Sequence, residues 1–331
     1  MDKDLKNCVT ILVNSCDAYS DLWYPFFALF KKYWGAEGAE IVLNTESKEF
    51  QFDGLNIKTI HPKSKNAPYG RRMIEVLKQI NSEYIILFLD DFFLRSKVKG
   101  DVIERIIDWM DRDKSIACFY NDCLDTYAEW EKDKYLGFKR IPWGASYTLN
   151  MQVGVWRRKK LIKYWRDNIS PWEWEEYCNV LSFNKKSDKF YALTSFDNSF
   201  CDYGHNEYMS MFGVYSGKWI LEDVEPLFKK EGIEIDFKKL GIYDANKEYN
   251  RFSNFEDNNY LIKKRLGLSY WFDYRLFCIR KYGFKKIRST SKRKFFQYID
   301  CLQKEAIKDF IKKNPNVEIN KDSYDLKEEN Y

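Results

Sequence analysis

The chain has 331 residues, with 55 Lys and Arg, 50 Asp and Glu and 2 His, which gives a formal net charge of +5. This length suits one large or two moderate domains, and 45% hydrophobic with 32% charged residues excludes a disordered, collagen-like or coiled-coil chain. Aromatic residues are in excess, because 11 Trp, 24 Tyr and 25 Phe make 18% of the sequence. Such an excess is typical of a packed core, and it also suits a surface that stacks on sugars or lies against lipid headgroups.

Simple patterns exclude several classes of protein. The N-terminal apolar run, Val9–Val13, is too short for a secretory signal, and no apolar stretch reaches the roughly 18 residues of a membrane span. The eight cysteines form no Cys-x-x-Cys pair, so we expect reduced thiols. With His61 and His205 as the only histidines, a histidine-rich metal centre is excluded. These patterns together predict a cytoplasmic globular protein.

The first part of the chain alternates between predicted strands and predicted helices. Short β-branched apolar runs predict buried strands, and apolar residues at helical spacing predict helices. The strands are expected at Val9–Val13, Ile41–Leu43, Leu55–Ile60, Tyr84–Leu89 and Ser115–Tyr120, and the helices at 21–34, 69–80 and 101–113. This alternation predicts an α/β fold with a Rossmann-like, mostly parallel sheet flanked by helices.

The pattern is less regular after residue 120. Residues 121–146 are expected to be irregular, Tyr147–Val155 to form a strand, and Lys159–Trp165 to form a helix. A tryptophan-rich turn follows within Ile169–Cys178. Short apolar pieces at Ser216–Ile220 and Ile233–Phe237 close the predicted sheet domain.

Residues 263–313 differ in character from the rest of the chain. They hold 16 Lys and Arg against 4 Asp and Glu, interleaved with aromatic residues, whereas residues 314–331 are acidic. Such a basic, aromatic segment binds an anionic membrane surface or nucleic acid, and it also occurs on charged helices packed against a catalytic body. We expect a basic helical extension over 246–313 and a flexible acidic tail over 314–331.

Polar residues follow three of the predicted strands. They are Asn14 and Asp17 after the first, Thr45 and Glu46 after the second, and Asp90 with Asp91 after the strand at 84–89. Ligands of parallel α/β sheets bind outside the carboxyl ends of the strands. The sequence therefore predicts a binding crevice at this edge of the sheet.

Asp90 and Asp91 form the sharpest motif. Two carboxylates at the end of a buried strand repel each other and lose hydration unless a cation or hydrogen-bond donors satisfy them. Their oxygen ligands suit Mg²⁺ or Mn²⁺ bridging to a nucleotide diphosphate. The alternative is that one Asp caps a helix. Arg71 and Arg72 open a helix before this strand, and Arg71 is our candidate for the diphosphate, since the arginine fork matches phosphate oxygens.

These motifs together resemble one group of glycosyltransferases. The strand end Leu89–Leu94 (LDDFFL), the first strand Ile11–Asp17 (ILVNSCD) and the downstream segment Ser170–Glu175 (SPWEWE) are similar to GT-A fold, family 2-like enzymes encoded in bacterial capsular polysaccharide and lipopolysaccharide clusters. The resemblance covers roughly residues 8–242. It implies a catalytic domain over 1–245, with nucleotide-sugar binding in about 1–120 and the acceptor side in about 121–245.

The resemblance also implies roles for the donor site. Asp91 would hold the metal, with Asp90 on the ribose or on a metal-bound water. The first-strand loop, Asn14, Ser15 and Asp17, would receive the nucleobase and ribose, with a UDP-sugar as the first expectation; an ordinary Asx turn is the alternative for this loop. The acids are adjacent rather than separated by one residue, which departs from the family's acidic motif.

The segment Ser170–Glu175 supplies candidates for acid–base chemistry. A sugar hydroxyl loses its proton as it attacks, and a positioned carboxylate commonly accepts it. Glu173 and Glu175 are two residues apart, so only one is expected to serve, and the resemblance favours Glu175. Trp172 and Trp174 would wall a sugar ring for the acceptor, and the alternative is a helix started by Pro171 with acidic capping residues.

Two further motifs complete the resemblance. Gln152–Arg158 is similar to the family's acceptor-side strand, and Gly217-Lys218-Trp219 is similar to a motif in which Lys218 would neutralise the departing diphosphate. His205 is a candidate third metal ligand or a hydrogen-bonded structural histidine.

The predicted function is therefore transfer of a sugar, with inversion, from a nucleotide-sugar donor to a saccharide or lipid-linked saccharide acceptor. We expect Mn²⁺ or Mg²⁺, contact of residues 263–313 with the inner face of the cell membrane, and no nucleic acid partner. Two alternatives are a sugar nucleotidyltransferase, which needs a glycine-rich loop that residues 14–21 lack, and a non-catalytic adaptor that uses the basic region.

Overall fold

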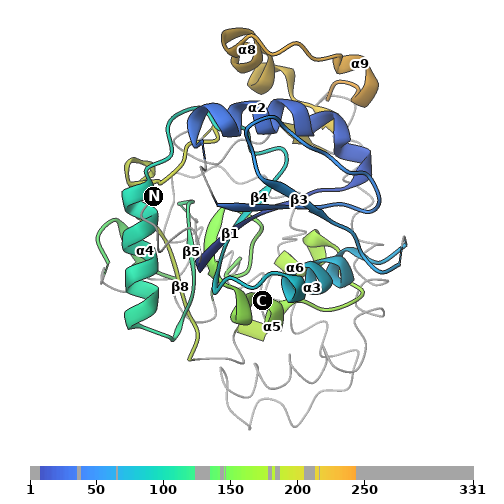
Figure 1. The fold of residues 1–331 in the computed structure, drawn as a ribbon. Coiled ribbons are helices and arrows are strands. Elements are labelled where there is room, and N and C mark those ends of the chain that lie inside the picture. The colour runs from blue at the N-terminus through green and yellow to red at the C-terminus, as the bar shows by residue number, and fades with distance from the viewer. Residues whose placement is uncertain are drawn as a thin grey trace, which may run out of the picture.

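The structure, a computed structural model, describes residues 8–35, 39–64, 66–123, 135–141, 145, 147–177, 181–182, 187–204, 213–215 and 217–243. Within them lies an α/β domain built on one large mixed sheet (Figure 1). The predicted extension over 246–313, the acidic tail over 314–331 and His205 lie outside the described residues. No helix of the described part is long and apolar enough to cross a membrane.

The large sheet has the strand order β3-β2-β1-β4-β7-β5-β8-β6. The parallel group β3-β2-β1-β4 continues through the antiparallel strand β7 to β5 and β8, which are parallel to each other, and ends in the antiparallel strand β6. The strands are β1 (Val9–Asn14), β2 (Glu40–Asn44), β3 (Ile57–Ile60), β4 (Tyr84–Leu89), β5 (Ile116–Tyr120), β6 (Phe138–Arg140), β7 (Gly154–Arg157) and β8 (Lys189–Leu193).

Helices cover both faces of the sheet. Figure 1 shows α2 on one face and α3, α5 and α6 on the other. The helices are α2 (Trp23–Tyr33), α3 (Tyr69–Gln79), α4 (Gly100–Arg112), α5 (Arg158–Tyr164), α6 (Pro171–Tyr177), α8 (Leu221–Glu231) and α9 (Phe237–Leu240), with 3₁₀ turns at Asp17–Leu22 and Phe196–Asn198. A small hairpin of β9 (Val214–Tyr215) and β10 (Lys218–Trp219) precedes α8.

The buried side chains form one core on each face. Alternation along β1 places Val9, Ile11 and Val13 in the core under α2, α4 and α8, and Leu12 in the core under α3, α5 and α6. Because both faces are covered, the central strands are apolar along their whole length, as the uninterrupted run Tyr84–Leu89 illustrates. Many of the aromatic residues lie in these two cores, for example those of α2, whose rings form stacked and edge-to-face contacts.

The α/β fold with a mostly parallel sheet is confirmed, and individual elements need correction. Strands β6 and β8 and helix α8 were not predicted. The strand expected over Tyr147–Val155 forms only from Gly154, because the preceding residues hold a turn by side-chain hydrogen bonds. Of the apolar piece Ile233–Phe237, only Phe237 enters an element, as the first residue of α9.

Candidate functional site

The polar ends of the central strands lie side by side at one edge of the sheet. In the strand register, Asn14 pairs with Asn44 on one side and with Leu89 on the other. Ser15 and Asp90 therefore follow at the same level. The polar strand ends predicted from sequence therefore lie together, and the loops after β1, β2 and β4 leave the sheet at this edge.

Asp90 is a buried carboxylate at this edge. Its side chain is 3% exposed, and its carboxylate accepts a hydrogen bond from the Ser15 hydroxyl. The Ser15 oxygen in turn accepts from the Trp23 indole N–H at 2.6 Å. Burial, followed by the charge of Asp91, raises the pKa of Asp90 well above its usual range. The chain Trp23–Ser15–Asp90 fixes the orientation of this carboxyl group.

Asp91 is partly buried beside Asp90, and burial raises the pKa of its carboxyl group to about 7. The three apolar residues that follow, Phe92, Phe93 and Leu94, are buried and anchor the pair to the core. The Asp91 carbonyl accepts from the Gly213 N–H at 3.0 Å, and a Cβ at Gly213 would come within 2.2 Å of the Phe93 ring. The chain leading into β9 thus packs directly on the Asp91 segment.

Adjacent buried carboxylates are a donor set that fits a hard divalent cation. Each charge raises the cost of ionising the other, and a cation removes that cost while keeping both groups ionised. Among the described residues, no group of three or more His, Cys, Asp or Glu side chains is placed to hold a metal ion. A divalent cation at this site would therefore take two ligands from Asp90 and Asp91, and its remaining ligands would come from substrate or water.

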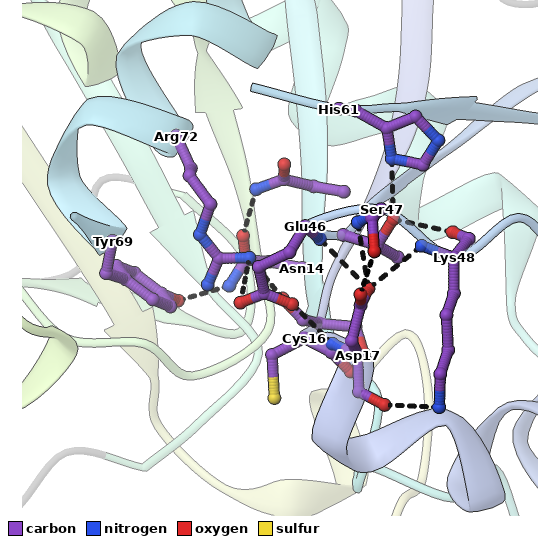
Figure 2. Close-up of polar contacts among 12 residues, drawn as sticks. Asn14, Cys16, Asp17, Glu46, Ser47, Lys48, His61, Tyr69 and Arg72 are labelled. Carbon is purple, nitrogen blue, oxygen red and sulfur yellow. Dashed lines mark hydrogen bonds and ion pairs between the residues drawn. The ribbon is translucent and has the colours of Figure 1, made fainter. Parts of the chain in front are cut away.

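Tyr69, the first residue of α3, connects this helix to the end of β1. Its hydroxyl accepts from the Asn14 side-chain amide, whose oxygen accepts from Asn44 at 2.6 Å (Figure 2). Burial raises the pKa of Tyr69, Arg72 opposes this, and the carboxylates of Asp90 and Glu175 add to the increase. Tyr69 thus lies within electrostatic reach of Asp90 and Glu175. It was not predicted.

Arg72, rather than Arg71, is the arginine of this site. The Arg72 side chain is 5% exposed, donates to the Ser15 carbonyl at 3.2 Å and pairs with Glu46 at 2.8 Å (Figure 2). Arg71 instead points to the surface and pairs with Asp167 at 2.5 Å, where both side chains are about half exposed. Tyr69, Arg72 and Val76 share the apolar stripe of α3, and that spacing is the signal that separates Arg72 from its neighbour.

Asp17 fastens the loop after β1 to the loop after β2. One of its carboxylate oxygens accepts from the backbone N–H groups of Glu46, Ser47 and Lys48 at 3.0 to 3.1 Å, and the other accepts from the Ser47 hydroxyl at 2.5 Å (Figure 2). The Asp17 N–H donates back to Glu46. The Asp17 carboxylate is thus engaged within the protein, and through Glu46 it meets Arg72.

We expect Asp17→Asn to lower stability at neutral pH and to matter less in acid. Burial alone would raise the Asp17 pKa, but hydrogen bonds from Ser47, Lys48 and Glu46 outweigh it and lower the pKa from 3.8 to about 2. A depressed carboxyl pKa stabilises the fold above the unfolded value and loses that contribution as the pH falls through the folded value. The gap between the urea midpoints of wild type and variant should therefore narrow as the pH falls from about 4 to about 2. A gap independent of pH, like that of the exposed control Asp53→Asn, contradicts this.

Helix α6 separates the four residues predicted from the Ser170–Glu175 segment. Glu173 is 2% exposed and forms a capping box, in which it accepts from the Ser170 N–H at 2.6 Å while the Ser170 hydroxyl accepts from the Glu173 N–H at 3.2 Å. Trp174 is fully buried and stacks on Trp165 at 4.5 Å between centroids. The Trp174 ring is therefore core and does not face a ligand, which corrects the expected acceptor wall. Trp172 is 66% exposed.

Glu175 contacts the loop that leads into β7. Its carboxylate accepts from the Met151 N–H at 2.7 Å. Because Leu87 of β4 pairs with Gly154 of β7, the residues before Gly154 run along the same sheet edge as Asp90. Of the two predicted bases, Glu175 therefore contacts the loop at this edge and Glu173 is engaged in the cap.

Lys218 lies in β10, and the turn before it contacts Tyr19. The Gly217 backbone donates to the Tyr19 hydroxyl, and burial followed by the charges of Cys16, Asp91 and Asp90 raises the pKa of Tyr19 to about 12. Tyr19 is therefore within electrostatic reach of the Asp90–Asp91 pair, and its hydroxyl lies next to Gly217.

Comparisons with known proteins give matches among solved structures alone: no family model and no curated protein matches the chain. S. aureus TarS 1-349 in complex with UDP-GlcNAc is 13% identical, with a TM-score of 0.39, and the match covers 70% of this chain and 68% of that one. The mannosyltransferase PcManGT from Pyrobaculum calidifontis, in complex with GDP-Man and Mn²⁺, is 9% identical, with a TM-score of 0.40 over 63% of this chain and 58% of that one.

A cytidylyltransferase from Leptospira borgpetersenii is 12% identical, with a TM-score of 0.36 over 77% of this chain and 96% of that one. The chain spans 36% of the length of a longer S. aureus TarS structure. The similar structures thus include a mannosyltransferase and a cytidylyltransferase.

Proposed function

We propose that this protein is a glycosyltransferase that takes a sugar from a nucleotide-sugar donor. The observation that carries the proposal is the Asp90–Asp91 pair, held at the end of β4 by Ser15 and Trp23 and bordered by the loops after β1 and β2. Diphosphate recognition requires positive charge or a cation opposite the phosphates, and two ionised carboxylates on a buried strand end recruit such a cation.

In this proposal the loop after β1 receives the nucleoside. Asn14 and Ser15 lie at the strand end, and Arg72, which pairs with the partly buried Glu46, donates to the Ser15 carbonyl. Asp17 supports this loop indirectly, because its carboxylate accepts hydrogen bonds from the backbone of residues 46–48. A UDP-sugar is the first candidate donor.

Asp91, with Asp90 beside it, would hold Mn²⁺ or Mg²⁺, which when bound supplies positive charge against the diphosphate. Lys218, in β10, is the second cationic group proposed to neutralise the diphosphate. Arg71 is assigned no role at the donor, since Asp167 pairs with it at the surface.

Glu175 is the proposed general base. It accepts the proton of an acceptor hydroxyl as that oxygen attacks the anomeric carbon, so that the nucleoside diphosphate leaves with inversion. The proposed acceptor is a saccharide or lipid-linked saccharide of bacterial surface polysaccharide synthesis, approached from the cytoplasmic side of the membrane.

We expect Glu175→Gln to lower kcat about 100-fold while the donor KM changes little, since a general base commonly contributes that much to the chemical step. Glu173→Gln is the matched control, because glutamine can replace glutamate in a capping box. Steady-state transfer assays on both variants decide between the two carboxylates. If kcat falls for Glu173→Gln and not for Glu175→Gln, then Glu173 is the base and the assignment of Glu175 is wrong.

Thermal denaturation with added ligands tests the proposed donor. UDP, GDP, CDP and UDP-GlcNAc, each with and without Mn²⁺, are compared on the full chain. At least one diphosphate is expected to raise Tm more in the presence of Mn²⁺ than the nucleotide or the metal does alone. No stabilisation by any nucleotide favours the non-catalytic adaptor. In a separate assay, formation of a CMP-sugar and pyrophosphate from CTP and a sugar favours the nucleotidyltransferase.

A further inference from the structure

Tyr147 combines an exposed ring with an unfavourable backbone. In the described part of the chain it is the one non-glycine residue with a positive φ, 54°, and its side chain is 51% exposed. In this left-handed region the Cβ atom crowds the backbone, so a bulky residue occupies it only where the surroundings enforce it. Residues held in this way gather at ligand-binding and catalytic sites.

Hydrogen bonds from buried residues enforce this conformation. The Asn150 side-chain amide donates to the Tyr147 carbonyl at 2.9 Å, and the Tyr120 hydroxyl donates to the Thr148 carbonyl at 2.8 Å. The Thr148 hydroxyl donates to the Ala145 carbonyl at 2.8 Å. Tyr120, Ala145, Thr148 and Asn150 are all buried. The backbone beneath the Tyr147 ring is thus fixed from the core.

The same loop carries the contact to the proposed base. Met151, four residues after Tyr147, donates its N–H to Glu175. Gln152 accepts from the Tyr203 hydroxyl at 3.1 Å, and the Tyr203 ring packs on Phe92, next to Asp91, at 4.8 Å between centroids. The loop is therefore tied to Glu175 on one side and to the Asp91 segment on the other.

We propose that Tyr147 is the aromatic platform on which a saccharide ring of the acceptor stacks beside Glu175. The proposal rests on the proposed function and deepens it. Of the two tryptophans predicted for this wall, Trp174 packs on Trp165 in the core. An exposed ring on a preorganised loop binds the apolar face of a sugar at a low entropic cost, because little backbone freedom is left to lose.

Saturation-transfer NMR on the full chain in the presence of UDP and Mn²⁺ tests the proposal. The probes are methyl glycosides of glucose, galactose, mannose and N-acetylglucosamine. Tyr147→Phe keeps the ring, Tyr147→Asn removes it while tolerating the left-handed backbone, and Tyr24→Gln, at another exposed tyrosine (54%), is the control.

At least one glycoside is expected to bind the wild type, Tyr147→Phe and Tyr24→Gln alike, and to bind Tyr147→Asn about tenfold more weakly. Equal binding to wild type and Tyr147→Asn, or no glycoside bound to the wild type, overturns the platform. Stabilisation by the nucleotides is measured on the same variants and should not change. If no nucleotide stabilises the wild type, the proposed function is rejected, whereas normal nucleotide stabilisation without glycoside binding rejects the platform alone.

Discussion

Asp91→Asn is expected to lower sugar transfer at least 100-fold, about 3 kcal/mol in transition-state free energy, and to leave the fold intact. The variant keeps the size and the backbone contact of residue 91, whose carbonyl accepts from Gly213, but loses the charge that would hold a cation at the diphosphate. Transfer is measured with donor and Mn²⁺ at saturation. The exposed control Asp108→Asn, on α4, should retain full activity.

The same variant is expected to be more stable than the wild type above pH 7. Burial raises the Asp91 pKa from 3.8 to about 7, so the folded state binds the proton more tightly than the unfolded state. Stability therefore falls as the pH rises from about 4 to about 7, and asparagine removes this fall. In metal-free buffer at pH 8 we expect the Tm of the variant to be higher by about 2 °C. Full transfer activity in Asp91→Asn, or a lower Tm at pH 8, contradicts the assignment of Asp91 as a buried, charged ligand.

Arg72→Met is expected to lower the free energy of unfolding by about 2 kcal/mol, since it removes the buried partner of a partly buried ion pair and the donor to the Ser15 carbonyl. Glu46 would lose its 2.8 Å partner and the Ser15 carbonyl its donor, so nucleotide stabilisation should be lost as well. Urea denaturation and the nucleotide-dependent Tm shift measure the two effects.

Arg71→Met is the matched control, because it removes the same group one residue away. Its partner Asp167 is about half exposed, and surface pairs of this kind contribute about 0 to 1 kcal/mol. Equal losses in the two variants contradict the placement of Arg72 in the site.

The arginine pair also shows what the sequence can predict. The apolar runs at 9–13 and 84–89 predict buried strands because a strand covered on both faces needs apolar residues throughout, and the polar residues after them mark the site edge. Choosing Arg72 over Arg71 requires the face of α3 that meets the strand ends. That face is set by Met73 and Val76 of α3, which pack into the core that also contains Leu12 and Val42 of the sheet.

Other parts of the site depend on contacts between distant residues. Trp172 and Trp174 are alike in sequence, and contacts with Trp165, Trp156 and the Tyr164 carbonyl, all distant in sequence, bury Trp174. The segment at 147–153 alternates like a strand, yet hydrogen bonds from Tyr120 and Asn150 hold it as a turn. Strand β8 has a short and partly polar sequence, and its pairing with β5 places it in the sheet.

The antiparallel strand β7 lies between β4 and β5. During synthesis, β4 and β5 leave the ribosome first, but they share no backbone hydrogen bonds until residues 154–157 follow and fill the space between them. The nascent chain thus carries two open sheet edges at the heart of the molecule while more than a third of its final sheet is still to come. Unpaired edges of this kind are templates for association, so the early chain is most prone to aggregation before β7 is inserted.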